Sequence, residues 1–164
     1  MLHPTLGILN YFIESLGLEA VTWLSSPNLV LPTLIAVDTW KWTPLIMLVA
    51  MAGMTAIPKT LYEAGKIDGA SDFQLFAHIT IPLIRPAVVV AAMIRFMDSL
   101  KEFDMIYTMT QGGPGVASQI LNLYTFDNAF RYFRMGYASS IIVVMFLIIF
   151  FATLILVKIR RVGR

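Results

Sequence analysis

Two helical stripes carry the residues best suited to bind a polar solute. Residues three and four apart share one face of an α-helix, which turns by about 100° per residue. One stripe consists of Asp38, Lys41, Trp42 and Leu45, and a second consists of Arg95, Asp98, Ser99 and Glu102. Both stripes lie within apolar surroundings, where a polar face lines an aqueous route or packs against polar partners.

The same charges could instead neutralise one another inside a helix bundle. Opposite charges are spaced (i, i+3) in three pairs, Asp38–Lys41, Arg95–Asp98 and Lys101–Asp104. Such residues are neighbours on a helix surface and attract each other. Binding and pairing are equally supported for Asp38 and Glu102, whereas pairing is favoured for Arg95, Asp98 and Lys101.

The other reactive residues do not suggest catalysis. His3 and His78 are far apart, and the absence of cysteine excludes disulfides and thiolate metal ligands. No base–nucleophile arrangement is evident, and the sequence has no G-x-x-x-x-G-K-[ST] motif for binding ATP phosphates. We therefore expect no catalytic residue, no metal and no cofactor.

The composition is that of a membrane protein. Hydrophobic residues make up 58% of the 164 residues and charged residues only 13%, with a mean hydropathy of +0.76. A soluble domain carries about a quarter charged residues. The net charge of +2 is too small to suggest a nucleic-acid partner.

The sequence contains three apolar segments, and the two stripes must be held in place by the helices that these segments form. The segments predict an all-α membrane protein, a polytopic helical bundle with about three spanning helices, since about 20 residues cross a bilayer as a helix. The expected spans are 30–57, 83–108 and 137–158, joined by loops 58–82 and 109–136, within one transmembrane domain 1–164. The segment before residue 29 is predicted to be either an interfacial amphipathic helix around Ile8 to Leu18 or an ordered loop packed on other subunits.

The distribution of Lys and Arg predicts the orientation. Seven of the twelve basic residues would lie on one side of the membrane: Lys59, Lys66, Arg85, Lys158, Arg160, Arg161 and Arg164. By the positive-inside rule, loop 58–82 and the C-terminus are cytoplasmic, and loop 109–136 is external. Three spans with an external N-terminus lead us to expect further helices upstream.

Loop 58–82 has the pattern of two short helices held at a fixed bend. Thr60 with Glu63, and Ser71 with Gln74, have capping-box spacing. Asp68-Gly69 between them is a turn signal. Pro58 and Pro82 flank the stretch and are expected to interrupt the neighbouring helices.

This loop resembles the EAA loop of permease subunits of ABC importers. The family pattern is E-A-A, three residues, G, nine residues, then I-x-L-P, and the matching residues here are Glu63, Ala64, Gly65, Gly69, Ile79, Ile81 and Pro82. The spacing fits throughout, and two residues depart: Gly65 replaces Ala and Ile81 replaces Leu. Gly65 is expected to soften the first helix, because glycine inside a helix costs up to about 1 kcal/mol relative to alanine.

Further motifs are similar to the carbohydrate-uptake branch of these permeases, the MalF-like family. They are Leu61-Tyr62-Glu63-Ala64, Ile67-Asp68-Gly69-Ala70, Phe103-Asp104-x-Ile106-Tyr107, Thr110-x-Gly112-Gly113-Pro114 and Gly136-Tyr137-Ala138. The resemblance covers essentially the whole chain but only the C-terminal half to two-thirds of a usual member.

The resemblance implies a function and partners. The chain would be a sugar or oligosaccharide permease subunit of a bacterial or archaeal cell membrane. It would act with a second permease subunit, a cytoplasmic ATP-binding cassette ATPase dimer and an extracytoplasmic solute-binding protein. The residues implied in ATPase coupling are Glu63, Ala64, Gly65, Asp68, Gly69, Ala70, Ile79 and Pro82. Those implied in the substrate path are Asp38, Trp42, Leu45, Ser99 and Glu102.

Two alternatives remain open. Within the same class of transporter, the substrate could be glycerol-3-phosphate or another polyol ester, with Arg95 and Lys101 as anion contacts. In a different class, the chain could be a truncated permease or a membrane scaffold that transports nothing.

Overall fold

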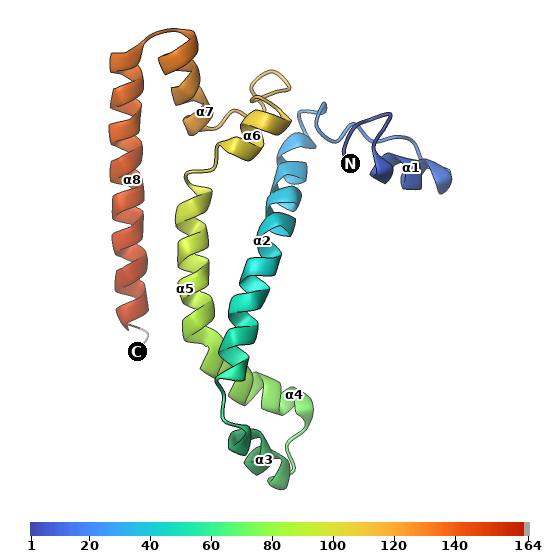
Figure 1. Cartoon of the computed structure of the whole chain (residues 1–164), viewed down its shortest axis with the longest axis vertical. Coiled ribbons are helices and arrows are strands. Elements are labelled where there is room, and N and C mark those ends of the chain that lie inside the picture. The colour runs from blue at the N-terminus through green and yellow to red at the C-terminus, as the bar shows by residue number, and fades with distance from the viewer. Residues whose placement is uncertain (163–164) are drawn as a thin grey trace. The chain divides into compact units, whose positions relative to one another are not determined.

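The computed structural model describes residues 1–162 and consists of helices and their connections, with no strand in that range (Figure 1). This confirms the predicted all-α class. The elements are α1 (Ile8–Ser15), α2 (Val30–Thr55), α3 (Lys59–Ile67), α4 (Asp72–Leu75), η1 (Phe76–Thr80), α5 (Ile81–Ser99), α6 (Asp104–Met109), α7 (Leu121–Phe126), η2 (Asp127–Arg131) and α8 (Met135–Val162). The segments η1 and η2 are π-helical.

Three helical stretches are long and apolar enough to cross a membrane: Val30–Thr55, Asp72–Ser99 and Met135–Lys158. Few of their side chains are buried within the chain itself, and in the most apolar part of the third stretch none is. These surfaces therefore require lipid or other helices around them. Arg164, the last residue of the predicted basic C-terminus, lies outside the described residues.

The chain divides into two compact units. We call residues 1–39 together with the chain from residue 100 onward the core unit, and residues 40–99 the hairpin unit. Helix α2 begins in the core unit and ends in the hairpin unit.

Packing in the core unit centres on a small apolar cluster. Val30 and Leu34 of α2 pack with Ile106 of α6 and Leu123 of α7, and each of these side chains is at most 7% exposed. The Gly112-Gly113-Pro114 turn is held by the buried Ser118, whose hydroxyl donates to the Gly113 carbonyl at 2.7 Å. Gly112 has φ +89°, and an added Cβ there would lie 3.0 Å from Leu123, so the turn requires glycine.

Asn10 organises the segment before α2. Its side-chain amide donates to the carbonyls of Pro4 and Val21, and its oxygen accepts from the indole of Trp23 at 2.8 Å. The side chain is 2% exposed. This segment thus combines a short helix, α1, with an ordered loop.

The single helix expected from residue 83 to 108 is wrong. Helix α5 ends at Ser99, whose hydroxyl donates to the Phe96 carbonyl, and residues 100–103 are not helical. The freed carbonyls of Leu100 and Glu102 accept instead from the amide of Asn122, at 3.2 and 3.0 Å. Glu102 therefore lies in a break between helices and not on a continuous helical stripe with Arg95 and Ser99.

Replacing Asn122 with Ala should loosen this break. The Leu100 and Glu102 carbonyls would lose their shared donor, and each hydrogen bond contributes about 1 kcal/mol. We expect faster hydrogen–deuterium exchange in the peptide covering residues 100–106, measured by mass spectrometry. Gln119→Ala, at an exposed position before the same helix, is the matched control. Equal exchange in the two variants would show that Asn122 does not hold the break.

Candidate functional sites

The first candidate site is the hairpin formed by α3, α4 and η1, which we call the α3–α4 hairpin (Figure 1). Helix α3 ends in a turn with Gly69 at φ +79°. The Ala70 N–H donates to the Gly65 carbonyl and the Gly69 N–H to the Lys66 carbonyl. This pair of bonds is a Schellman motif, which closes a helix and reverses the chain. The bend predicted at Asp68-Gly69 is therefore present.

One of the two predicted capping boxes forms. The Ser71 hydroxyl accepts from the Gln74 N–H, and the Gln74 side chain accepts from the Ser71 N–H at 2.8 Å. The box predicted for Thr60 and Glu63 is wrong, because α3 already begins at Lys59 after Pro58, and its cap makes no side-chain hydrogen bond. Thr60 thus lies within the first turn.

Gly65 allows the two helices of the hairpin to approach closely. A Cβ at this position would lie 2.5 Å from Cδ2 of Leu75, closer than side-chain atoms pack, and 3.5 Å from Cδ1 of Ile79. Leu75 is 4% exposed and fills the notch that the missing side chain leaves. The expectation that Gly65 merely softens α3 is therefore incomplete, since this glycine determines the packing of α4 on α3.

The hairpin runs directly into α5. The expectation that Pro82 interrupts the helix is wrong: residues from Asp72 to Ser99 form one unbroken helical stretch. The wider turn at η1, in which the Ile81 N–H bonds to the Phe76 carbonyl, precedes the proline. Such π-turns occur within helices where regular α bonding is disturbed. Pro82 lies directly after this wide turn and has no backbone N–H, so the helix passes it with one backbone hydrogen bond fewer.

Tyr62 of α3 reaches across to this wide turn. Its hydroxyl lies 2.8 Å from the hydroxyl of Thr80, which is 4% exposed. Sequence reasoning missed this bond, and it missed the packing of Leu75. The packing of Leu75 had one signal in the sequence, the glycine that replaces alanine at position 65.

The hairpin has the features of a protein-docking element. Its outer surface exposes two large apolar side chains beside the turn, Ile67 at 87% and Phe73 at 79%. A cleft of about 370 Å³ opens on it, and its walls include most of the predicted coupling residues: Gly65, Asp68, Gly69, Ala70 and Ile79, together with Gln74, Leu75 and His78. Glu63 and Ala64 are exposed on α3, and Pro82 is exposed on α5.

The predicted substrate-path residues are divided between the two units. In the hairpin unit, the Arg95 guanidinium lies over the Trp42 ring, 4.7 Å from its centroid. The indole nitrogen of Trp42 is buried and makes no hydrogen bond within the described part of the chain. Leu45 is 47% exposed. The Ser99 hydroxyl is used within its own helix.

In the core unit, Glu102 has a structural contact of its own. Its carboxylate accepts from the Met105 N–H at 3.4 Å, in the first turn of α6. A carboxylate at this point is also stabilised by the positive end of the helix dipole. Asp38 is half-buried on α2.

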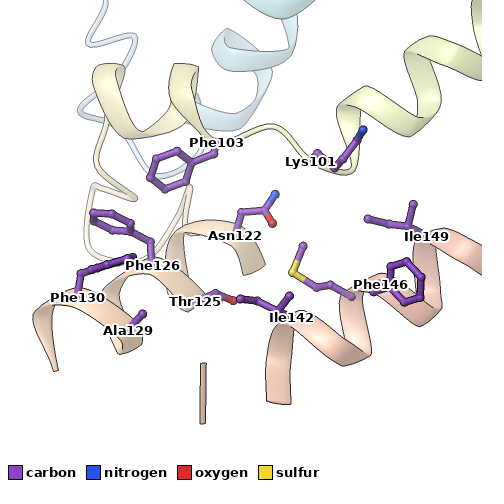
Figure 2. Close-up of a pocket in the computed structure, with 11 residues that line it drawn as sticks. Lys101, Phe103, Asn122, Thr125, Phe126, Ala129, Phe130, Ile142, Phe146 and Ile149 are labelled. Carbon is purple, nitrogen blue, oxygen red and sulfur yellow. The ribbon is translucent and has the colours of Figure 1, made fainter. Parts of the chain in front are cut away.

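The core unit also contains a cavity of about 450 Å³ that sequence reasoning missed (Figure 2). It lies between α7 and η2 on one side and α8 on the other, and it is also lined by Phe103, on the side of Phe126, and by Lys101, on the side of Ile149. Phe103, Tyr107, Phe126 and Phe130 form a chain of ring contacts with centroids 5.1 to 5.4 Å apart. The cavity is predominantly apolar and includes none of the predicted substrate-path residues.

Comparison with known proteins places the chain in a family. Residues 3–161 match the model of the binding-protein-dependent transport system inner membrane component. The trehalose/maltose transport system permease protein MalF of Thermococcus litoralis is 38% identical over the whole chain, which covers 55% of that protein. The sulfoquinovosyl glycerol transport system permease protein SmoG of Agrobacterium fabrum is 36% identical over 97% of the chain, which covers 52% of it.

A solved structure shows the same fold. A bacterial ABC transporter involved in the import of the acidic polysaccharide alginate contains a chain with a TM-score of 0.89 and 24% identity, over 98% of this chain and 56% of that one. The chain spans about half the length of the two permease relatives above. It belongs to the family of binding-protein-dependent transport system inner membrane components.

Proposed function

We propose that the chain forms part of the membrane permease of an ATP-driven ABC importer that translocates a sugar or oligosaccharide. The observation that carries this proposal is the α3–α4 hairpin, a compact element with exposed Ile67 and Phe73 that continues without a break into a membrane-length helix. A movement imposed on such an element is passed on to the helix. The family membership supports this interpretation.

In this proposal, the hairpin contacts a cytoplasmic ATPase dimer through Glu63, Ala64, Gly65, Asp68, Gly69, Ala70, Ile79 and Pro82. The hairpin and the C-terminus face the cytoplasm, as the clustering of Lys59, Lys66 and Arg85 near the hairpin favours. A second permease subunit covers the exposed apolar helix faces together with lipid. A solute-binding protein delivers the substrate, and one of the solved alginate transporter structures is a complex with a substrate-bound periplasmic protein.

The substrate path that we propose includes Asp38, Trp42, Leu45, Ser99 and Glu102. Trp42 is the best supported of these, because its indole N–H is buried, makes no hydrogen bond within the described part of the chain and can donate to a sugar hydroxyl. Glu102 has its capping role in α6 as well. The two relatives are named as permeases of trehalose/maltose and sulfoquinovosyl glycerol transport systems. These names favour a carbohydrate substrate over a phosphate ester.

The coupling proposal predicts that Glu63→Ala and Gly69→Ala each reduce uptake at least about tenfold. Loss of Glu63 removes a charge at the docking surface, and any side chain at Gly69, with φ +79°, is strained by about 1–2 kcal/mol. Uptake of labelled maltose and trehalose would be measured in cells that express the whole transporter, with immunoblots of the membrane fraction to confirm insertion.

The control for these variants is Glu14→Ala, which makes the same chemical change at an exposed residue at the end of α1. Uptake by this variant should match that of the unaltered protein. Normal uptake by both hairpin variants would refute the coupling role. Absence of uptake by the unaltered transporter for every sugar and ester tried would favour the scaffold alternative.

Competition between substrates separates the sugar from the polyol ester. Labelled maltose, trehalose and glycerol-3-phosphate would each be offered with a hundredfold excess of the unlabelled compounds. We expect sugars to block uptake and the ester to have no effect, because the two permease relatives are named for carbohydrate substrates. Uptake of glycerol-3-phosphate that sugars do not inhibit would reverse this assignment.

A further inference from the structure

The α3–α4 hairpin is connected unequally to its two neighbouring long helices. On one side, α4, η1 and α5 form one helical stretch from Asp72 to Ser99. On the other side, α2 ends at Thr55, and residues 56–58 are not helical. Pro58 has an extended ψ of 132° and no N–H, so the helical bonding pattern does not pass through it.

Helix α3 therefore depends on side chains for its attachment to the stretch Asp72–Ser99. The contacts that make the attachment include the packing of Leu75 into the notch at Gly65, with Ile79 beside it, and the hydroxyls of Tyr62 and Thr80, which are 2.8 Å apart. Thr80 is 4% exposed, and a hydrogen bond shielded from water is electrostatically stronger than an exposed one.

The π-turn at η1 is what allows both contacts to form. Thr80 follows Leu75 by five residues, and such residues lie about 140° apart around a regular α-helix. A turn with i→i+5 bonding brings them closer to one face. Leu75 and Thr80 can then both meet α3, one at Gly65 and the other at Tyr62.

The contact of α2 with α5 is of a different kind. A Cβ built on Gly53 of α2 would lie 3.4 Å from Cγ2 of Ile84 and 3.7 Å from the Cβ of Ala87. This is van der Waals contact between two helices, which permits small sliding movements of one past the other.

From this asymmetry we infer that Tyr62 and Thr80 are positioning residues that fasten α3 to α5, so that a displacement of the hairpin moves α5 as a lever while α2 follows through sliding contact. The inference rests on the proposed coupling function. It specifies which helix receives the movement of the hairpin. The displacement is transmitted to α5, and the Tyr62–Thr80 hydroxyl pair determines how much of the displacement reaches that helix.

The rigidity of this path can be measured with spin labels. The chain has no cysteine, so label pairs can be introduced directly. One pair joins α3 to α5, Thr60→Cys with Ile94→Cys, and a second joins α3 to α2, Thr60→Cys with Met47→Cys; all three positions are exposed. Double electron–electron resonance on the transporter purified with its partner subunits would give the distance distributions with and without ATP and vanadate.

The expected result is a narrow α3–α5 distribution that ATP leaves unchanged and an α3–α2 distribution that ATP shifts. Tyr62→Phe and Thr80→Val should each broaden the α3–α5 distribution, and the double variant should broaden it no further, since both remove the same bond. Thr80→Ser keeps the hydroxyl and should restore the narrow distribution. Thr55→Val makes the same change on α2, where the hydroxyl bonds to the Ala52 carbonyl, and should have no effect.

A second readout is the amount of labelled maltose taken up per ATP hydrolysed in proteoliposomes. We expect Tyr62→Phe and Thr80→Val to lower this ratio by roughly threefold to tenfold, the factor that one hydrogen bond contributes, with complex assembly unchanged by gel filtration. An unchanged α3–α5 distribution in both variants would overturn the inference. If either variant fails to assemble, the distribution for the other decides.

The failure of this inference and the failure of the proposed function are distinguishable. If Glu63→Ala and Gly69→Ala transport normally, the coupling function itself falls. If those variants lose uptake while Tyr62→Phe and Thr80→Val retain the distribution and ratio of the unaltered protein, coupling stands and the lever through α5 does not.

Discussion

The helix that runs unbroken from Asp72 to Ser99 is the constraint on which the hairpin unit depends. Because α4 and α5 belong to one helical stretch that bends between them (Figure 1), any element packed on α4 is joined through continuous helix to the membrane-length part. The Schellman turn at Gly69 returns α3 antiparallel to this start. The capping box at Ser71 satisfies the backbone N–H groups of Ser71 and Gln74, so that the stretch begins at a defined residue.

The sequence correctly predicted those features of the hairpin that depend only on neighbouring residues in the chain. Gly69 has the positive φ expected of a turn, and Ser71 with Gln74 forms the expected box. The box at Thr60 failed because α3 begins at Lys59 with Pro58 as its N-cap, two residues earlier than a Thr60 cap requires. The passage of the helix through Pro82 depends on a π-turn, for which the sequence offers no periodic signal.

Helix α5 ends at Ser99, earlier than predicted, and the cause lies in a distant part of the chain. Residues 100–103 leave the helix because Asn122 supplies donors to their carbonyls from a distant part of the chain. Helical periodicity describes side-chain faces and contains no information about such a partner. The same limit applies to the proposed substrate path: the spacing identified Trp42 and Arg95 as separate stripe members, whereas the structure stacks one on the other. The apolar cavity beside α8 follows from packing alone.

The notch at Gly65 makes the residues at positions 65 and 75 depend on each other. Alanine, the usual residue at this point of the EAA pattern, would place its methyl group 2.5 Å from Leu75. A chain with alanine there must hold a smaller or differently oriented side chain at position 75, or separate the two helices. Positions 65 and 75 therefore meet across the hairpin, and a transplanted hairpin should be exchanged with both residues from the same parent.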